Sequence, residues 1–345
     1  MEYALLQAVF IPLLLSPVAY IIGRKSGANA ATWFTFGVLL YCTILVVLAS
    51  LEGTYEEHYA WTSLFGEFGF LIDGLASPFA IIIYVLCTIL ALYSKPYMVN
   101  HFTHQYEELQ QQVTSGTGQT SVLPAASLQD YINKQSGLYF ALFLAFSMGM
   151  LGTVLATNLI EFYIFFEVML IPSFFLIAFW GAGPRRRIAL MFFFWTHVGA
   201  VVLLLGFLVI GLSIGSFDFA DIRESEIPED VVLLAAVAII IGLGVKLAAF
   251  LFHIWLPYAH AAAPTPISAL LSPAMIGIGA YGIFRLIVEF LPMQYGELAI
   301  WFHVWGLVTM IYGGAMALMQ DDIKRLFAYS SVSQMGYLLF GIGTY

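Results

Sequence analysis

The sequence predicts an all-α protein that crosses a membrane about ten times, and three observations support this prediction. Of the 345 residues, 61% are hydrophobic and only 10% are charged, whereas a soluble domain carries about one quarter charged residues. Apolar runs recur along the whole chain, each long enough at about 1.5 Å per residue to cross a hydrocarbon core about 30 Å thick. The runs are apolar on every face, without the alternation of a membrane barrel, so the backbone must satisfy its hydrogen bonds within helices.

A hydropathy window of about 19 residues places the expected spans along the chain. The ranges are 3–23, 31–51, 71–93, 137–157, 159–180, 187–213, 231–253, 267–290, 298–319 and 325–345. The first range is expected to be a spanning helix and not a signal peptide, because basic residues do not precede it and it lacks a small-residue cleavage site. Cys42 and Cys87 fall within apolar runs, where they offer neither a disulfide framework nor metal-ligand spacing.

These ranges divide the chain into four parts. Residues 1–94 hold the three N-terminal transmembrane helices. Residues 95–136 form a polar segment rich in Gln, Ser and Thr, which we expect to be mostly flexible with a surface helix over 106–113. Residues 137–290 hold helices four to eight, and residues 291–345 hold helices nine and ten.

The basic residues predict the orientation in the membrane. If the N-terminus faces outward, nine of the twelve Lys and Arg residues lie in loops that face inward. The outward loops then hold the acid-rich stretches 52–58 and 218–230, with Arg223 and Arg285. Because Lys and Arg concentrate in cytoplasmic loops, we expect the N-terminus outside and residues 95–136 on the inner side.

Two ionisable residues lie well inside the expected spans, Glu167 in the fifth and Lys246 in the seventh. A charge at a helix centre costs about 2.5–3.5 kcal/mol on insertion scales. A low dielectric disfavours the charged form of each group, whereas bringing the two together favours it, so a facing pair is able to hand a proton on. The alternative is a buried ion pair that only fixes the register of two helices. Since intramembrane ionisable residues mark ion and proton paths, we predict that Glu167 and Lys246 are a proton-transfer pair.

Histidines close to membrane depth are candidates for a proton relay, because the unperturbed pKa of imidazole lies near neutrality. These candidates are His197, His253, His260 and His303. A structural hydrogen bond at a helix end is the competing role for each of them, and it is the commoner one.

Helix seven is expected to be broken near its end. The segment HIWLPYAHAAAPTPIS (253–268) holds Pro257, Pro264 and Pro266, and proline removes a backbone donor and disfavours helix in the preceding residue. Irregular backbone at membrane depth survives only where it lines protein or water, as in transporters. The segment GIGAYG (277–282) has the glycine spacing of a dinucleotide site, but it lies inside an apolar helix, so we interpret these glycines as close helix contacts.

Several segments, taken in this order, resemble one membrane-protein family. They are IDGLASP (72–78), NLIEFYIFFEVMLIPSFFLIAFWG (158–181), THVGA (196–200), GVKLAAFLFHIWLPYAHAAAPTPISALL (244–271) and QDDIKRLFAYSSVSQMGYLLFGIG (320–343). They resemble the antiporter-like membrane subunits of respiratory complex I and its relatives, which include Mrp-type cation/proton antiporters. Within that family the chain is most similar to the chain M type, also called subunit 4.

The resemblance implies roles for the residues singled out above. Glu167 matches the helix-five glutamate and Lys246 the helix-seven lysine whose coupled protonation drives transport, and helix seven should be broken at Pro257. The family has two inverted five-helix repeats, so 137–290 would be the complete first repeat and 291–345 the start of the second. The chain is then either a fragment or a subunit whose remainder is supplied by a split partner.

The resemblance also implies a function. The chain would be a proton-translocating subunit of a complex I-like NADH (or reduced F420 or ferredoxin):quinone oxidoreductase in the plasma membrane of a prokaryote. It would bind other membrane subunits and no nucleic acid. Neither metal nor cofactor is expected in this chain, because quinone, iron–sulfur and flavin centres belong to partner subunits. The alternatives are an Mrp-type Na⁺/H⁺ antiporter subunit without redox function and a scaffold that has lost transport.

Two positions depart from the family pattern. The central lysine of helix eight aligns with Gly277, and the relay histidine of helix ten aligns with Gln334. The proton wire would then run through water, Ser272, Ser330, Tyr281 or Gln334, or it would be incomplete.

Overall fold

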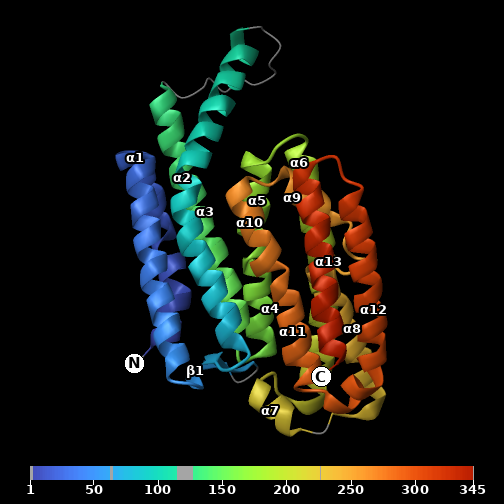
Figure 1. Ribbon diagram of the computed structural model, residues 1–345. Helices are drawn as coiled ribbons and strands as arrows, with labels where there is room; N and C mark the ends of the chain where they lie inside the picture. Colours follow the sequence, from blue (N-terminus) through green and yellow to red (C-terminus); the bar gives the residue numbers. More distant parts are fainter. Residues whose placement is uncertain (1–2, 63–64, 115–126, 226, 345) are drawn as a thin grey trace.

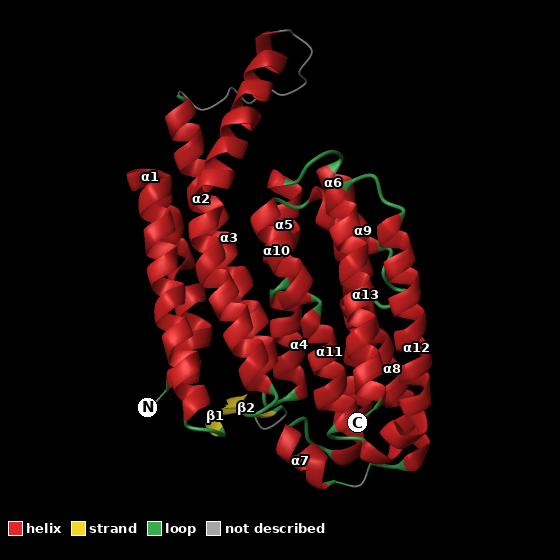
Figure 2. Ribbon diagram, in the orientation of Figure 1, coloured by secondary structure: helices red, strands yellow, loops and turns green. Residues whose placement is uncertain are grey.

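The computed structural model describes residues 3–62, 65–114, 127–225 and 227–344 (Figure 1). Helices dominate the described part of the chain (Figure 2), which confirms the prediction of an all-α membrane protein. The helices of the first part of the chain are α1 (Ala4–Leu51), α2 (Ala76–Thr114), α3 (Leu128–Leu155), α4 (Leu159–Val168), α5 (Leu170–Trp180) and α6 (Arg185–Ile214). They are followed by α7 (Phe219–Glu224), α8 (Glu229–Leu247), α9 (Trp255–Ala262), α10 (Thr265–Leu270), η1 (Leu271–Met275), α11 (Gly277–Ile283), η2 (Phe284–Val288), α12 (Pro292–Leu318) and α13 (Ile323–Gly343).

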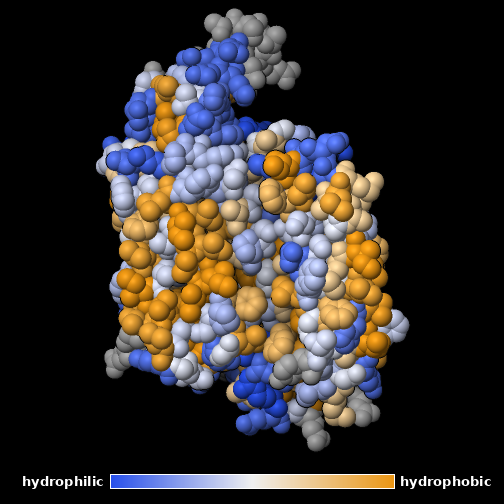
Figure 3. Space-filling model, viewed as in Figure 1, coloured by the Kyte–Doolittle hydropathy of each residue, from blue (hydrophilic) through white to orange (hydrophobic). Residues whose placement is uncertain are grey.

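Within the described residues, seven helical stretches are long and apolar enough to cross a membrane. The helices α4 and α5 form one such stretch, and α10 to η2 form another with two π-helical turns. The expected number of ten spans is not confirmed. On the face in view in Figure 3, hydrophobic side chains gather over the middle of the bundle and hydrophilic ones at its two ends, which fits a protein that spans a membrane.

Helix α1 folds back on itself at Gly27. Gly27 has φ 89° and ψ 174° inside the 48-residue element, a conformation that glycine adopts without steric cost. The Tyr41 hydroxyl donates to Gln7 Oε1 at 2.6 Å, so the two halves lie side by side. A single assigned helix therefore covers both expected spans, 3–23 and 31–51.

The polar segment 95–136 is more helical than expected. Helix α2 continues to Thr114, and α3 begins at Leu128, where Ser127 Oγ accepts a hydrogen bond from the Asp130 amide. Residues such as Gln, Glu and Leu favour helix, so the expected surface helix over 106–113 is the end of α2. This end projects beyond the rest of the bundle (Figure 1), while residues 115–126 lie outside the described part.

A β-hairpin that the sequence analysis missed covers one end of α1. Strands β1 (Tyr55–Thr62) and β2 (Gly66–Ile72) pair antiparallel. The carboxylate of Glu57 is buried and accepts from the amides of Leu5 and Leu6, both at 2.9 Å. It also accepts from the Tyr55 and Tyr59 hydroxyls. Glu57 thus caps the free amides at the start of α1, where negative charge is favourable.

Replacing Glu57 with alanine should lower the free energy of unfolding by about 2–3 kcal/mol, because a charged acceptor is removed from several buried donors. Thermal unfolding of the purified chain in detergent micelles measures the change. Glu56→Ala is the matched control, since Glu56 is exposed and its ion pair with His58 contributes little. Equal stability of the two variants would contradict the capping role.

The two ends of the bundle differ in charge. One end holds the turn with Arg185, Arg186 and Arg187, and Lys324 Nζ donates to Ala263 O at 2.9 Å there. We call it the arginine end. The opposite end holds the hairpin, α7 and the start of α12, and we call it the acidic end (Figure 1).

Candidate functional site

Glu167 lies where α4 passes into α5. Met169, with φ −70° and ψ −24°, joins the two helices, so the span continues through a local interruption beside Glu167. Glu167 Oε2 lies 2.8 Å from Nδ1 of His197 on α6, whose ring stacks on Phe193. Glu167 Oε1 is buried and has no hydrogen-bond partner among the described residues. The predicted relay residue His197 is therefore the direct partner of the predicted acid.

Lys246 lies in the last turn of α8. Its side chain is 1% exposed, and Nζ lies 4.6 Å from the ring centroid of Phe166. Within the part of the chain that the structure describes, Nζ has no hydrogen-bond partner. A cation–π contact stabilises an ammonium, but a buried charge without hydrogen bonds remains costly. The amine is thus suited to release and rebind a proton.

Glu167 and Lys246 approach the same region without a direct ion pair. Phe166, the neighbour of Glu167 in α4, supplies the aromatic face against Lys246. Among the described residues, no carboxylate lies within 4.0 Å of Lys246 Nζ, although Glu167 acts on it electrostatically at longer range. The carboxylate bonds to His197 instead, so proton transfer between the two groups stays a prediction.

The break in helix seven begins at Ala248, earlier than expected. Ala248 and Leu251 have positive φ values of 56° and 81°, and helix resumes at Trp255. The expected break in helix seven is confirmed, but it precedes Pro257, which lies in the first turn of α9, where an amide is not needed for the helix. Lys246 thus lies directly before the break.

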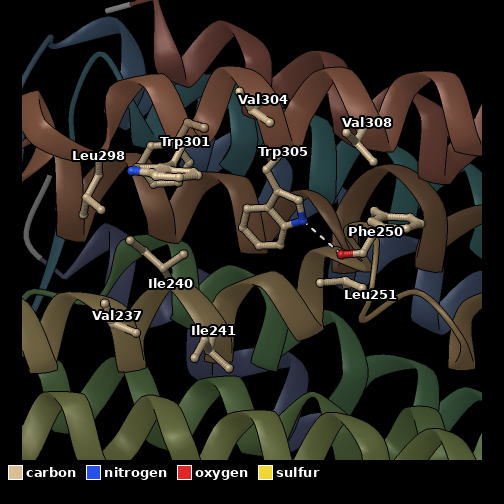
Figure 4. Close-up of a pocket in the computed structure, with 11 residues that line it drawn as sticks. Val237, Ile240, Ile241, Phe250, Leu251, Leu298, Trp301, Val304, Trp305 and Val308 are labelled. Carbon is tan, nitrogen blue, oxygen red and sulfur yellow. Dashed lines mark hydrogen bonds between the residues drawn. The ribbon is translucent and has the colours of Figure 1, made fainter.

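Helix α12 fixes the broken segment. The Phe250 amide donates to Thr309 Oγ1 at 3.2 Å, and Trp305 Nε1 donates to Phe250 O at 2.9 Å. Non-helical backbone at membrane depth requires such partners. Figure 4 shows Trp305 bonded to Phe250, and both residues line an apolar groove between α8 and α12. The groove has a volume of about 400 Å³. The residues named as lining this groove are all apolar or aromatic.

Four of the predicted relay residues line one cavity of about 530 Å³, which lies between α9–η1 and α13. They are His260, Ser272, Ser330 and Gln334. His260 is 3% exposed, and its Nδ1 lies 2.9 Å from Ser268 Oγ. Ser272 Oγ lies 2.5 Å from Ser331 Oγ. We call this the relay cavity, because hydroxyl, amide and imidazole groups meet in it.

The other three relay candidates lie elsewhere. His253 Nε2 lies 3.1 Å from the Tyr312 hydroxyl of α12, and the Tyr281 hydroxyl donates to Val154 O at 2.6 Å. His303 Nδ1 lies 3.1 Å from Ala299 O of its own helix. These three residues are not among those that line the relay cavity.

The glycines of α11 differ in their surroundings. A Cβ at Gly279 or Gly282 would overlap atoms of α8, which confirms these two as close helix contacts. A Cβ at Gly277 would meet only Phe79, at 3.9 Å, so the position where the family pattern has lysine has room for a side chain.

Two buried charges within the long apolar helical stretches were missed by the sequence analysis. Glu161 at the start of α4 is 0% exposed, and Arg285 is 2% exposed. The expectation that Arg285 lies in an outward loop was wrong, because it lies in η2 and pairs with Asp73 and Glu289 at 2.8 and 2.7 Å. The spacing Asn158-x-x-Glu161 could have indicated Glu161 as a residue of a helix start, and Asn158 Oδ1 does cap the Ile160 amide.

Comparison with known proteins gives a family and a fold. Residues 156–345 match the family model described as NADH:quinone oxidoreductase/Mrp antiporter, TM. The chain is 30% identical, over 99% of its length, to NAD(P)H-quinone oxidoreductase chain 4 1 of Picosynechococcus sp.. It is 31% identical, over 97% of its length, to NADH-quinone oxidoreductase subunit M of Rickettsia bellii. It spans 59% and 64% of the length of these two relatives.

Two solved assemblies have the same fold at 20% sequence identity. One is the membrane-bound sulfane sulfur reductase, an archaeal respiratory membrane complex, with a TM-score of 0.80 over 98% of this chain and 64% of that one. The other is the Mrp complex from Dietzia sp., with a TM-score of 0.78 over 100% of this chain and 60% of that one.

Proposed function

The chain belongs to the NADH:quinone oxidoreductase/Mrp antiporter transmembrane family, and on that premise we propose that it is a proton-translocating membrane subunit of a complex I-like quinone oxidoreductase. The observation that carries the proposal is the Lys246 amine. It is buried without a hydrogen-bond partner among the described residues, directly before the break that follows α8. The Glu167 carboxylate lies on the neighbouring helix α4 and bonds to His197.

In the proposed proton step, Lys246 and His197 compete for the Glu167 carboxylate. When the carboxylate turns toward Lys246, the ammonium gains a counter-ion and the amine takes a proton that arrives through the relay cavity. When the carboxylate returns to His197, as in this structure, the ammonium loses that counter-ion and releases the proton. A conformational or electrostatic change in a neighbouring subunit would shift the balance between the two states.

The energy would come from partner subunits. Moving one charge across the membrane needs about 2.3 kcal/mol per 100 mV, which electron transfer from NADH, reduced F420 or ferredoxin to quinone would supply. The flavin, iron–sulfur and quinone sites are proposed to lie in those partners. We propose that the complex lies in the plasma membrane of a prokaryote with the N-terminus outside.

An Mrp-type Na⁺/H⁺ antiporter subunit is the second candidate. The similarity to the Mrp complex from Dietzia sp. favours it, because that TM-score of 0.78 is close to the 0.80 of the respiratory complex. The same amine and carboxylate would then exchange protons against a sodium gradient without a redox reaction.

Purification of the native complex through a tag on this chain should separate the two candidates. For the oxidoreductase we expect iron–sulfur subunits among the partners identified by mass. We also expect proton movement in vesicles that starts on addition of the electron donor and does not respond to a sodium gradient. Small antiporter partners, with proton movement driven by sodium and indifferent to the donor, would overturn the oxidoreductase in favour of the antiporter.

A further inference from the structure

A cleft of about 630 Å³ opens at the acidic end of the bundle. Carboxylates line it from the hairpin, from the loop before α2, from the region of α7 and from the residue after η2. They are Glu56, Glu67, Asp73, Asp218, Asp221 and Glu289. The basic side chains on its wall are His58 and Arg223, and Arg223 pairs with Glu289.

The carboxylates are spread around the cleft and do not converge on one point. Within the described ranges, no group of three or more His, Cys, Asp or Glu residues could hold a metal ion. The cleft therefore does not suit a tightly bound cation, whose site would need several convergent oxygen ligands. It does suit water and exchangeable protons, because single carboxylates accept and release them.

Glu161 lies beneath the floor of this cleft. Its Oε2 accepts hydrogen bonds from the Thr157 and Gly69 amides, both at 3.3 Å. Thr157 lines the cleft, and Gly69 lies between Glu67 and Leu71, which also line it. The side chain is fully buried, and Oε1 has no hydrogen-bond partner in the described chain. A proton on this oxygen would remove the cost of an unpaired buried charge.

The charged groups around this floor differ in how readily they exchange protons. Burial raises the pKa of Asp218, which accepts from Asn158 Nδ2 at 2.7 Å. Burial also opposes ionisation of Asp73, but hydrogen bonds from Arg285 and the Ala76 amide outweigh it and lower the pKa of Asp73. Asp218 is therefore the better proton acceptor, and Asp73 stays ionised. The remaining charged groups that line the cleft are Glu56 and His58 of β1, Glu67 of β2, Asp221 and Arg223 of α7, and Glu289 after η2.

Helix α4 connects this floor with the proposed proton-transfer pair. Glu161 lies in its first turn and Glu167 in its last, about 9 Å apart along the axis at 1.5 Å per residue. Between them, the rings of Phe162 and Phe166 stack at 5.9 Å, and Phe166 is the ring that contacts Lys246.

We propose that Glu161 and the acidic cleft form a proton outlet. An N–H bond of the Lys246 ammonium breaks, water carries the proton along α4 past the Phe162 and Phe166 rings, and an O–H bond forms on the Glu161 carboxylate. That O–H bond then breaks as an O–H bond forms on the Asp218 carboxylate, and water in the cleft removes the proton from Asp218. This inference rests on the proposed function, and it adds the exit for the proton.

Glu161→Gln tests the outlet in the purified complex, reconstituted in vesicles with a pH dye. Glutamine keeps the shape and the acceptor but does not carry a proton, so proton translocation should fall about 100-fold. Glu161→Asp should restore part of it. The matched control is Glu297→Gln, since Glu297 is exposed on α12 and does not line the cleft. Equal translocation by Glu161→Gln and Glu297→Gln would overturn the outlet.

A parallel Lys246→Ala variant separates failure of the outlet from failure of the proposed function. If Lys246→Ala stops translocation and Glu161→Gln does not, only the outlet is wrong. If Lys246→Ala translocates normally, the proposed function itself fails. Infrared spectroscopy of the complex gives a second measurement that does not depend on turnover. We expect a protonated carboxyl band that Glu161→Gln removes and whose deuterium exchange Asp218→Asn slows; exchange unaffected by Asp218→Asn would overturn the transfer step.

Discussion

Replacing Lys246 with alanine should abolish proton translocation by the assembled complex, with a loss of about 100-fold or more, while the complex still assembles. Lys246 Nζ makes no hydrogen bond in the described chain, so its removal breaks no polar contact that holds α8 in place. The amine is nonetheless the group on which the proposed proton step depends. Donor-driven acidification in reconstituted vesicles measures the loss, and subunit composition by mass checks assembly.

Two control variants make the Lys246 experiment specific. Lys246→Met fills the buried volume without a proton site, so it should be as inactive as Lys246→Ala. Lys25→Ala removes an exposed lysine from α1 and should leave translocation unchanged. Glu167→Gln should match the loss at Lys246, because glutamine does not supply the counter-ion charge. Translocation at the native rate by Lys246→Met would disprove the role of the amine.

Replacing Arg285 with methionine should lower the free energy of unfolding by about 3 kcal/mol. This value is at the lower end of the range for breaking a buried ion pair, because both carboxylate partners are partly exposed. The guanidinium is 2% exposed and joins Asp73 to Glu289, and it also donates to the Tyr281 hydroxyl at 3.2 Å. Methionine fills the space but leaves both carboxylates without this partner. Thermal unfolding in detergent measures the effect, and Arg223→Met is the control because its side chain is 49% exposed.

The effect at Arg285 should depend on pH in one direction. The folded-state pKa of Asp73 is lowered from its ordinary value of 3.8, with hydrogen bonds from Arg285 and backbone amides outweighing burial. A group with a lowered folded pKa stabilises the protein above its unfolded pKa, and this contribution is lost as the pH falls through the folded value. The native chain and Arg285→Met should therefore differ less in their free energy of unfolding below pH 3.8 than above it. A difference that widened with acid would contradict the pairing.

The fold class and the charges of the central site could be predicted because both are visible in local composition. An acid or an amine inside a long apolar run stands out, which is how Glu167 and Lys246 were found. The contact of Glu167 with His197 could not be predicted, because the two residues lie 30 positions apart on different helices. The number of spans is also poorly defined by hydropathy, since α1 folds back within one assigned helix.

The features that sequence reasoning missed all depend on distant partners. Glu57 holds the hairpin against α1 because its carboxylate accepts hydrogen bonds from the amides of Leu5 and Leu6. These donors lie more than 50 positions away in the sequence, so the role of Glu57 could not be predicted. The prolines indicated an irregular segment, but its position is set by Thr309 and Trp305 of α12. Of the relay candidates, the serines, Gln334 and His260 meet in one cavity, while His253 and Tyr281 bond elsewhere.

The unwound segment after α8 is hydrogen-bonded to α12, so the position of α12 is coupled to the position of the Lys246 amine. Two of the hydrogen bonds that α12 makes to this segment end on Phe250, four positions after Lys246 along the chain, and a third joins Tyr312 to His253. Of the seven long apolar stretches described, α12 has the smallest buried share. A lateral displacement of α12 would therefore be passed through these hydrogen bonds to the last turn of α8, which holds Lys246, without a rearrangement of the interior of the bundle.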